Sequence, residues 1–177
     1  MKQSKVPRFD VRPCRFLLLF VIFMIVGFGL LVAPFLQPAI VRFSRFLVAV
    51  SASLIHLCGG HAKMDGVILF SPANGFGVEM QNGCNGINVT ILLWAAIAAF
   101  PASRKWQAVG LVGGTMALQG VNLLRFISLF YLGRYSMTLF DFVHRFLWEA
   151  LIMLDAMVVF CIWAQASLTP ARSLSCA

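Results

Sequence analysis

The chain has 177 residues, of which 60% are hydrophobic and only 11% are charged, and its formal net charge is +8. Soluble domains carry about a quarter charged residues, so the composition excludes an ordinary soluble protein and indicates one membrane-embedded domain over residues 1–177. The basic residues gather at the ends of apolar segments and form no patch interleaved with aromatic side chains, which predicts the lipid bilayer rather than a nucleic acid as partner.

The first apolar segment covers residues 16–33 and is free of charge. At 1.5 Å per residue it spans about 27 Å, close to the thickness of a bilayer core. A secretory signal peptide also begins with basic and then apolar residues. Because this run is long and Pro34 follows it, we interpret it as an uncleaved transmembrane helix with a cytoplasmic N-terminus. The basic tail before it contains Lys2, Lys5, Arg8, Arg12 and Arg15.

Residues 34–85 are expected to form a long outer loop. Pro34 and Pro38 interrupt the helix. Arg42 and Arg45 then lie three residues apart within the apolar stretch 40–47, which predicts an amphipathic helix in the outer membrane interface. Apolar runs at 67–70 and 76–80 flank a turn-forming stretch and predict a short β-hairpin. Its second strand leads into a polar, glycine-spaced turn that carries Cys84.

Three further transmembrane helices are predicted at residues 86–102, 108–132 and 146–166. A basic turn at 101–106 belongs in the cytoplasm by the positive-inside rule, and a short outer loop is expected at 133–143. Four crossings bring the C-terminus back to the cytoplasmic side. The predicted fold class is therefore an all-α integral membrane protein with about four transmembrane helices, an outer amphipathic helix and a short β-hairpin before the cysteine-bearing turn.

This topology predicts that three polar residues from different helices meet at the outer face. Cys84 lies at or just before the start of the second helix, Arg125 near the outer end of the third, and His144 just before the fourth. A helix N-terminus favours an anion, and the thiolate is the nucleophilic form of cysteine. An arginine within a membrane segment is costly and indicates function. The shared depth of the three residues is stronger evidence than any one of them.

These residue types suit acyl transfer. A thiolate attacks a carbonyl to form a thioester, an imidazole transfers the thiol proton to the leaving amine, and a cation stabilises the oxyanion. Each residue also has a structural interpretation. Cys84 can be merely buried, Arg125 can pair with Glu149 or Asp155, and His144 can be an interfacial residue. Asp141 can orient the His144 ring, although a surface pair with Arg145 is the interpretation that we favour for it.

Cofactor and metal sites are not expected. The five cysteines, at positions 14, 58, 84, 161 and 176, contain no C-x-x-C pair. His56 and His61 lie five residues apart in a glycine-rich loop, which is a weak metal-site pattern. Cys58 and Cys84 are the two cysteines expected to face outward, and a disulfide between them would leave no nucleophile.

On these residues the sequence resembles the exosortase/archaeosortase family of multi-pass membrane cysteine transpeptidases. Three motifs carry the resemblance, over about residues 80–165: Cys84-Asn85-Gly86-Ile87, Asn122-Leu123-Leu124-Arg125, and His144 ahead of the last helix. The compact length is similar to the short exosortase H branch. Many members have Ser after the cysteine, where this chain has Asn85. The resemblance implies catalytic roles for Cys84, Arg125 and His144 and supporting or substrate-binding roles for Asn85, Gly86, Asn122 and Asp141.

The resemblance also implies the partner and the location. The substrates would be exported proteins with a C-terminal tag made of a recognition motif, a transmembrane helix and a basic cluster. The enzyme would cleave the tag at the periplasmic face of the inner membrane, with both termini in the cytoplasm, and pass the acyl group to an acceptor. Two other classes stay open: a membrane thiol-disulfide oxidoreductase, which needs a second cysteine beside Cys84, and a non-enzymatic membrane assembly factor.

Overall fold

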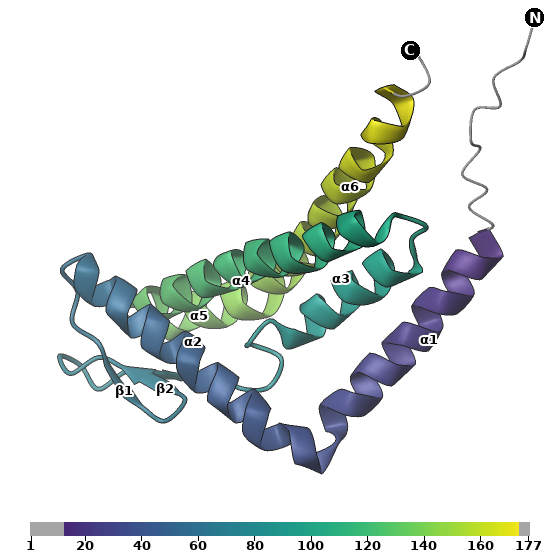
Figure 1. Cartoon of the computed structure of the whole chain (residues 1–177). Coiled ribbons are helices and arrows are strands. Elements are labelled where there is room, and N and C mark those ends of the chain that lie inside the picture. The colour runs from purple at the N-terminus through teal and green to yellow at the C-terminus, as the bar shows by residue number, and fades with distance from the viewer. Residues whose placement is uncertain (1–12, 174–177) are drawn as a thin grey trace, which may run out of the picture.

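The computed structural model describes residues 13–173, and the chain is helical over most of that length (Figure 1). The basic residues of the tail at positions 2–12 and Cys176 lie outside the described residues. The long helices are α1 (Pro13–Val32), α2 (Gln37–Leu57), α3 (Ile87–Ala99), α4 (Arg104–Tyr135) and α6 (Trp148–Ser173). Three short helical pieces are η1 (Pro34–Leu36), α5 (Met137–Phe142) and the π-helical turn η2 (Val143–Leu147).

Four helical stretches are long and apolar enough to cross a membrane: Pro13–Val32, Pro34–Leu57, Arg104–Tyr135 and Met137–Leu168. A small antiparallel sheet precedes the cysteine-bearing turn. The predicted fold class is thus confirmed. The segment predicted at 86–102 is helical over 13 residues only. That length corresponds to about 20 Å, which is less than the thickness of a bilayer core.

The amphipathic helix expected at 40–47 is part of the longer helix α2. One face of α2 is buried at intervals of three or four residues, and it contains Ile40, Ser44, Leu47, Val48, Ser51, Ala52 and Ile55. Arg42 and Arg45 lie on the exposed face, which is the division of polarity that the sequence indicated. Figure 1 shows α2 crossing α4 at a steep angle, whereas α3 lies beside α1 and α4.

The predicted outer loop at 133–143 is wrong, because this stretch is almost entirely helical. Helix α4 continues to Tyr135, and α5 begins at Met137. Ser136 separates them with an extended backbone, and its hydroxyl caps α5 by accepting a hydrogen bond from the Leu139 N–H at 3.4 Å. The chain then passes through η2 into α6 without a break. His144 therefore lies within a π-helical turn and not in a loop.

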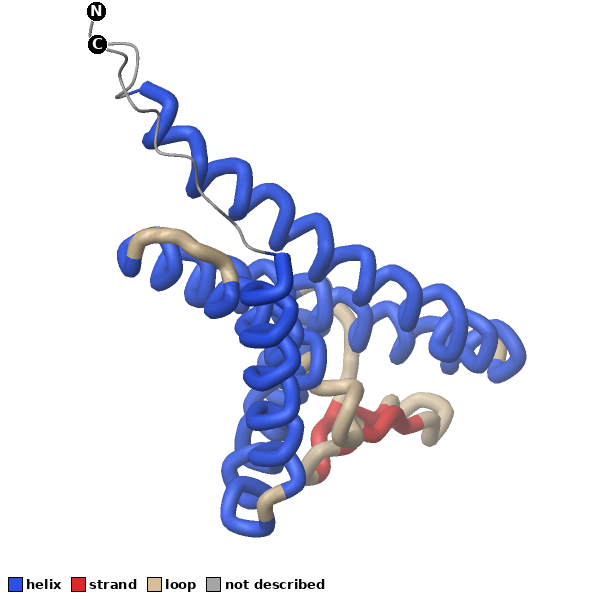
Figure 2. The backbone as a smooth tube through the Cα atoms, turned by 90° about the vertical axis from the view of Figure 1, so that its right-hand side faces the viewer, coloured by secondary structure: helices blue, strands red, loops and turns tan. Residues whose placement is uncertain are grey.

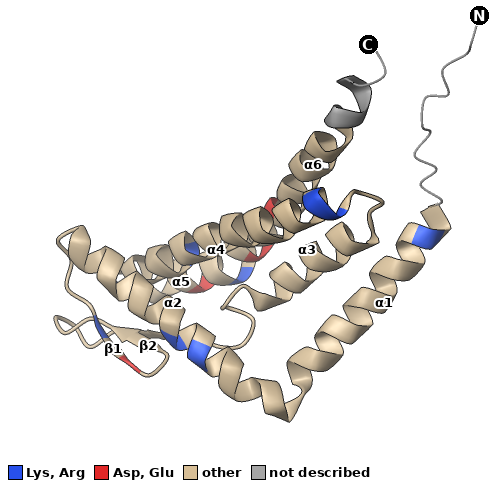
Figure 3. Ribbon diagram, in the orientation of Figure 1, with Lys and Arg blue, Asp and Glu red and all other residues tan. Residues whose placement is uncertain are grey.

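The helical body has two distinct ends. The beginning of α1, the α3–α4 turn and the end of α6 lie at one end, and the strands lie at the other (Figures 1 and 2). Figure 3 shows basic residues at the start of α1 and at the start of α4, where Arg15, Arg104 and Lys105 are located. The cysteine-bearing turn follows the sheet directly and belongs to the opposite end from this basic one.

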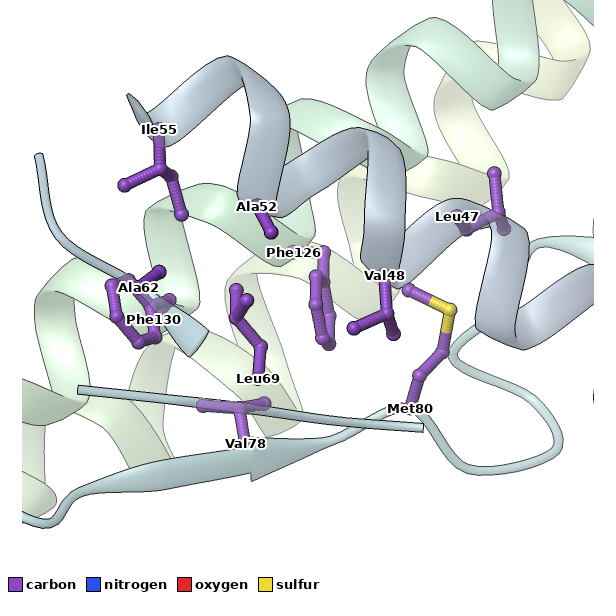
Figure 4. Packing of buried hydrophobic residues seen from close by; sticks show 10 residues of the cluster. All are labelled: Leu47, Val48, Ala52, Ile55, Ala62, Leu69, Val78, Met80, Phe126 and Phe130. Atoms are coloured by element: carbon purple, nitrogen blue, oxygen red, sulfur yellow. The ribbon is translucent and has the colours of Figure 1, made fainter. Parts of the chain in front are cut away.

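The sheet contains one strand more than the predicted hairpin. Strands β1 (Lys63–Asp65), β2 (Ile68–Phe70) and β3 (Gly77–Glu79) are antiparallel in the order β1-β2-β3. In register, Leu69 lies opposite Val78. These two side chains are buried against Phe126 and Phe130 of α4 and against Val48, Ala52 and Ile55 of α2 (Figure 4). The sheet is thereby fixed between α2 and α4.

A second buried cluster holds α3, α4 and α6 together. Its members include Leu93, Ile97, Leu118 and Trp163. The Trp163 indole N–H crosses from α6 to donate to the Trp106 carbonyl at 2.7 Å, and a Cβ at Gly110 would collide with the same indole ring. Small residues on α4 thus permit close helix approach, as the sequence indicated.

Candidate active site

The turn that carries Cys84 needs glycine on both sides of it. Gly83 and Gly86 have φ values of 105° and 74°, a left-handed conformation that other residues rarely adopt. A Cβ at Gly86 would also lie 3.1 Å from the side-chain carbon of Asn122. The Cys84 N–H donates to the Gln81 carbonyl at 3.0 Å and closes the turn. Gly86 is the N-cap residue of α3, so Cys84 precedes the helix by three residues instead of occupying its first turn.

Asn85 connects this turn to helix α2 through a hydrogen bond of its buried side chain. Its side chain is 1% exposed. The side-chain oxygen accepts a hydrogen bond from the Ile87 N–H at 3.2 Å, and the amide donates to the Ser44 hydroxyl of α2 at 3.2 Å. Asn85 is therefore satisfied by the protein itself, and its hydrogen bonds connect the turn to α2. Ser44 lies 41 residues earlier in the chain, so sequence reasoning about Asn85 had no means of identifying this partner.

The Arg125 guanidinium forms a hydrogen bond to the Cys84 thiol. Arg125 lies on α4, is 4% exposed, and donates from Nη2 to the Cys84 Sγ at 3.3 Å. Arginine has only donor groups, so the sulfur is the acceptor in this contact. The Asp155 Oδ2 is buried without a hydrogen-bond partner, so this oxygen does not pair with Arg125. Two residues that are 41 positions apart thus form one polar unit in an apolar protein.

His144 approaches the same site from η2. Its ring stacks on Phe140, with centroids 5.6 Å apart and an interplanar angle of 21°. The Nδ1 atom is buried and has no hydrogen-bond partner, so Asp141 does not hold this nitrogen. Asp141 is exposed on α5 and, like Arg125, lies within electrostatic range of the ring. Single π-helical turns often occur at functional sites, and here the turn aims the imidazole at the cavity.

One cavity of about 200 Å³ contains all three side chains. The sheet contributes its edge strand to the wall, and α4 and α5 contribute aromatic and aliphatic side chains. The lining consists of Gly77, Val78, Glu79, Gln81, Cys84, Arg125, Phe126, Leu129, Phe140 and His144. The clustering expected from topology is therefore present. Sequence reasoning missed the apolar wall of Phe126, Leu129 and Phe140. For Leu129 and Phe140 the four-residue helical spacing from Arg125 and His144 was a usable signal, whereas no such spacing indicated Phe126.

A buried polar chain connects α3 to α4 beneath the site. The Thr90 hydroxyl donates to the Gly86 carbonyl at 2.8 Å, and the Gln119 amide donates to that hydroxyl at 3.4 Å. The Asn122 amide in turn donates to the Gln119 side-chain oxygen at 3.4 Å. Asn122 is fully buried and lies one turn before Arg125 on the same helix face. Gly86 and Asn122 thus belong to one hydrogen-bonded chain that links the start of α3 to the helix that carries Arg125.

Of the two histidines near the end of α2, His56 has a structural role. The His56 Nε2 lies 2.7 Å from the Ala62 carbonyl oxygen and closes the connection from α2 to β1. His61 is exposed. Over residues 13–173, no three His, Cys, Asp or Glu side chains are grouped closely enough to hold a metal ion. Cys14, Cys58, Cys84 and Cys161 are all free thiols, and Cys58 does not line the cavity.

Comparison with known proteins gives one finding. The family model described as transmembrane exosortase matches residues 9–162. This range contains α1 to α5, η2 and most of α6, and it includes the entire cavity. No curated protein and no solved structure shows significant similarity to the chain.

Proposed function

Because the chain belongs to the transmembrane exosortase family, we propose that it is a cysteine transpeptidase that removes the C-terminal sorting tag of exported proteins. The observation that carries this proposal is the 3.3 Å contact between Arg125 and the Cys84 sulfur in a cavity that His144 also lines. A nucleophile, a fixed cation and a titratable ring are the groups that acyl transfer through a thioester requires. The tag would consist of a recognition motif, a transmembrane helix and a basic cluster.

In the proposed first step the Cys84 sulfur attacks the scissile carbonyl. A bond forms between sulfur and carbon, and the carbonyl oxygen gains negative charge, which the Arg125 guanidinium stabilises. His144 takes the thiol proton and gives it to the amide nitrogen as the carbon–nitrogen bond breaks. The tag leaves as an amine, and the remaining protein is held as a thioester. An acceptor nucleophile then attacks the thioester and releases the sulfur.

Co-expression with a tagged protein tests the function. A protein with the motif, helix and basic cluster from the same organism is expected to lose its tag only when this chain is present. Brief treatment with hydroxylamine should intercept the thioester and release the substrate as a hydroxamate, which intact mass spectrometry detects. Complete retention of the tag by several such candidates, in the presence of the folded protein, would contradict the proposal.

Arg125→Lys is expected to lower the cleavage rate by about 10²–10³-fold, the usual cost of losing one oxyanion donor. Lysine keeps the charge, but it lacks the planar fork of donors that contacts the sulfur. The measurement is tag removal per unit of folded enzyme. Arg134→Lys is the matched control, because Arg134 is on the same helix but lies over the Phe130 and Tyr131 rings outside the cavity. Full activity of Arg125→Lys would show that a point charge suffices.

The rival function as a thiol-disulfide oxidoreductase requires a second cysteine beside Cys84. The cavity lining contains only one cysteine, and Cys58 is a free, exposed thiol at the end of α2. These observations support the transpeptidase over the oxidoreductase. A non-enzymatic assembly factor does not require a buried arginine that donates a hydrogen bond to a thiol. The contact between Arg125 and Cys84 therefore favours an enzyme.

We propose further that the protein resides in the inner membrane with the cavity on the periplasmic side. The gathering of Arg15, Arg104 and Lys105 at the opposite end supports this orientation. Although the stretch Pro34–Leu57 is long and apolar enough to cross a membrane, we expect α2, with its two exposed arginines, to lie along the periplasmic interface, and the shorter α3 to be the second crossing.

Single-cysteine variants test the orientation. A membrane-impermeant maleimide added to spheroplasts is expected to label a protein whose only cysteine is Cys58, because α2 ends at the cavity side. A protein whose only cysteine is Cys14, at the start of α1, should react only after the membrane is permeabilised. Both side chains are exposed in the structure, so accessibility alone does not separate them. The reverse labelling pattern would invert the topology.

A further inference from the structure

Strand β3 has one unpaired edge. Within residues 13–173, the sheet order β1-β2-β3 leaves the side of β3 that faces away from β2 without a partner strand. The register is fixed by the Ser71 N–H donating to the Phe76 carbonyl at 2.8 Å and the Met80 N–H donating to the Val67 carbonyl at 2.9 Å. In an antiparallel pair the backbone groups of successive residues point alternately toward and away from the partner. The N–H and C=O groups of Gly77 and Glu79 therefore point away from β2.

This edge borders the cavity that contains the thiol. Gly77, Val78 and Glu79 form part of the same wall as Cys84, Arg125 and His144. Gly77 and Glu79 are both exposed, whereas Val78 points into the core and is held by Phe126 and Phe130. The edge is consequently rigid and accessible at the same time. Natural proteins protect such edges with short strands, charged side chains, proline, bulges or covering elements. Strand β3 is short and carries one charge, on Glu79, but it contains no proline and no bulge, and Gly77 and Glu79 stay exposed.

We propose that β3 binds the cleavage segment of the substrate as an added strand, which places the scissile carbonyl beside Cys84. The inference rests on the proposed function and identifies how the same site holds its peptide. A peptide bond within a helix has its carbonyl engaged, so the segment that is cut must be extended. An edge strand supplies main-chain hydrogen bonds to an extended peptide whatever its side chains are. Gly77 has no side chain, and this leaves the exposed face open for those of the substrate.

The occupant is a polypeptide and not a lipid or a small solute. The walls contributed by β3 present alternating backbone donors and acceptors, the pattern that another strand complements. Phe140 and His144 line the same cavity as β3, and the Phe140 ring contacts the ring of Phe76, the residue before β3, edge-to-face with centroids 5.9 Å apart. A strand paired with β3 would therefore enter the cavity that the imidazole and the sulfur also line.

The opposite edge of the sheet provides a matched control. Strand β1 also has a free side, and its register with β2 pairs Met64 with Leu69. Because the backbone groups of Leu69 face Val78, those of Met64 point outward from the other edge. Met64 is exposed and lines a separate hollow near His56. Proline removes one outward N–H at either edge, and edge positions are where a sheet tolerates it.

The experiment measures alkylation of Cys84 in the purified full-length protein in detergent, with the other four cysteines replaced by Ser. The probe is a mixed library of tripeptidyl chloromethyl ketones, whose carbon bonds to the sulfur as chloride leaves. Each alkylation rate is divided by the rate with chloroacetamide, which has no peptide. Gly77→Pro and Glu79→Pro are expected to lower this ratio roughly tenfold, about the worth of one strong hydrogen bond. Met64→Pro should leave the ratio unchanged.

A second arm uses the unsubstituted strand, so that it does not depend on folding of the proline variants. Library members with N-methylated amides cannot donate hydrogen bonds to β3. With the protein whose β3 is unsubstituted, they should show the same decrease in the ratio of the peptide alkylation rate to the chloroacetamide rate. An equal ratio for methylated and plain libraries would overturn the proposal, as would an equal loss in Met64→Pro. Dimers by light scattering that dissociate in both β3 variants would assign the edge to a second copy of the chain and would also overturn it.

Failure of this inference is separable from failure of the proposed function. If tag removal requires Cys84 but the ratio is the same in all variants, only the role of β3 is overturned. If tag removal proceeds without Cys84, the proposed function itself is refuted, whatever the alkylation ratio.

Discussion

Replacing Cys84 by Ala is expected to abolish tag removal completely, the largest effect of any single substitution in this protein. The sulfur is the atom that would form the thioester, and the other side chains that line the cavity include no second thiol. Acid–base and electrostatic assistance can be weakened by degrees, but without the nucleophile the covalent route does not exist. Cys84→Ser is also expected to be inactive, because a hydroxyl is a much weaker nucleophile than a thiol near neutral pH.

The controls for this prediction are the remaining cysteines. Cys58→Ala and Cys161→Ala remove exposed free thiols outside the cavity and should leave the rate of tag removal unchanged. The same outcome is expected for Cys14→Ala and Cys176→Ala. Tag removal is followed by the change in substrate mass, and protein yield and size-exclusion profile show that each variant is folded. Cleavage by the Cys84→Ala protein would refute the thioester mechanism, and loss of activity in Cys58→Ala would revive the oxidoreductase.

The meeting of Cys84, Arg125 and His144 could be predicted because helix direction alternates across a membrane. Cys84 lies near the start of one helix, Arg125 near the end of the next, and His144 at the start of a third. If consecutive helices cross the membrane in opposite directions, these three positions lie at a similar depth in the membrane. The argument uses only chain order and segment length, which hydropathy reveals. It could not predict the 3.3 Å contact between Arg125 and the sulfur, since that depends on rotation of α4 about its axis. The buried faces of α4 and the Asn122 network set that rotation.

Other features were hidden because they depend on tertiary contacts. Strand β1 is only three residues long, all of them exposed, so no pattern of buried residues marks it in the sequence, and it is recognised by its pairing with β2. Helix α4 continues past the predicted end to Tyr135, and near this end Phe76 packs against Gly133, a contact between residues far apart in sequence. The π-helical turn at His144 inserts one residue into a helix, and no local pattern encodes it. Arg125 consequently lies ten residues before the end of α4, deeper in the body than the sequence suggested.

His144→Ala is expected to lower the cleavage rate by about 10²–10⁴-fold, the usual contribution of general acid–base catalysis. The ring is held by stacking on Phe140, and its buried Nδ1 is not engaged by the protein. The stacking orients the ring, and the unengaged nitrogen allows the imidazole to transfer a proton between the sulfur and the leaving group. Because the peptide is held by other groups, His144→Ala should still bind tagged substrate. Co-purification of uncleaved substrate with this variant, together with its cleavage rate, measures the two effects separately.

His61→Ala is the control for the histidine prediction, since His61 is exposed and does not line the cavity. If His144→Ala cleaves at the wild-type rate, the imidazole has no catalytic role and another base must act. Glu79 is then the candidate, because it lines the same cavity, whereas His56 is occupied by the Ala62 carbonyl. If His144→Ala instead fails to retain substrate, the ring belongs to recognition. A large loss of rate with substrate still bound is the one result that assigns proton transfer to His144.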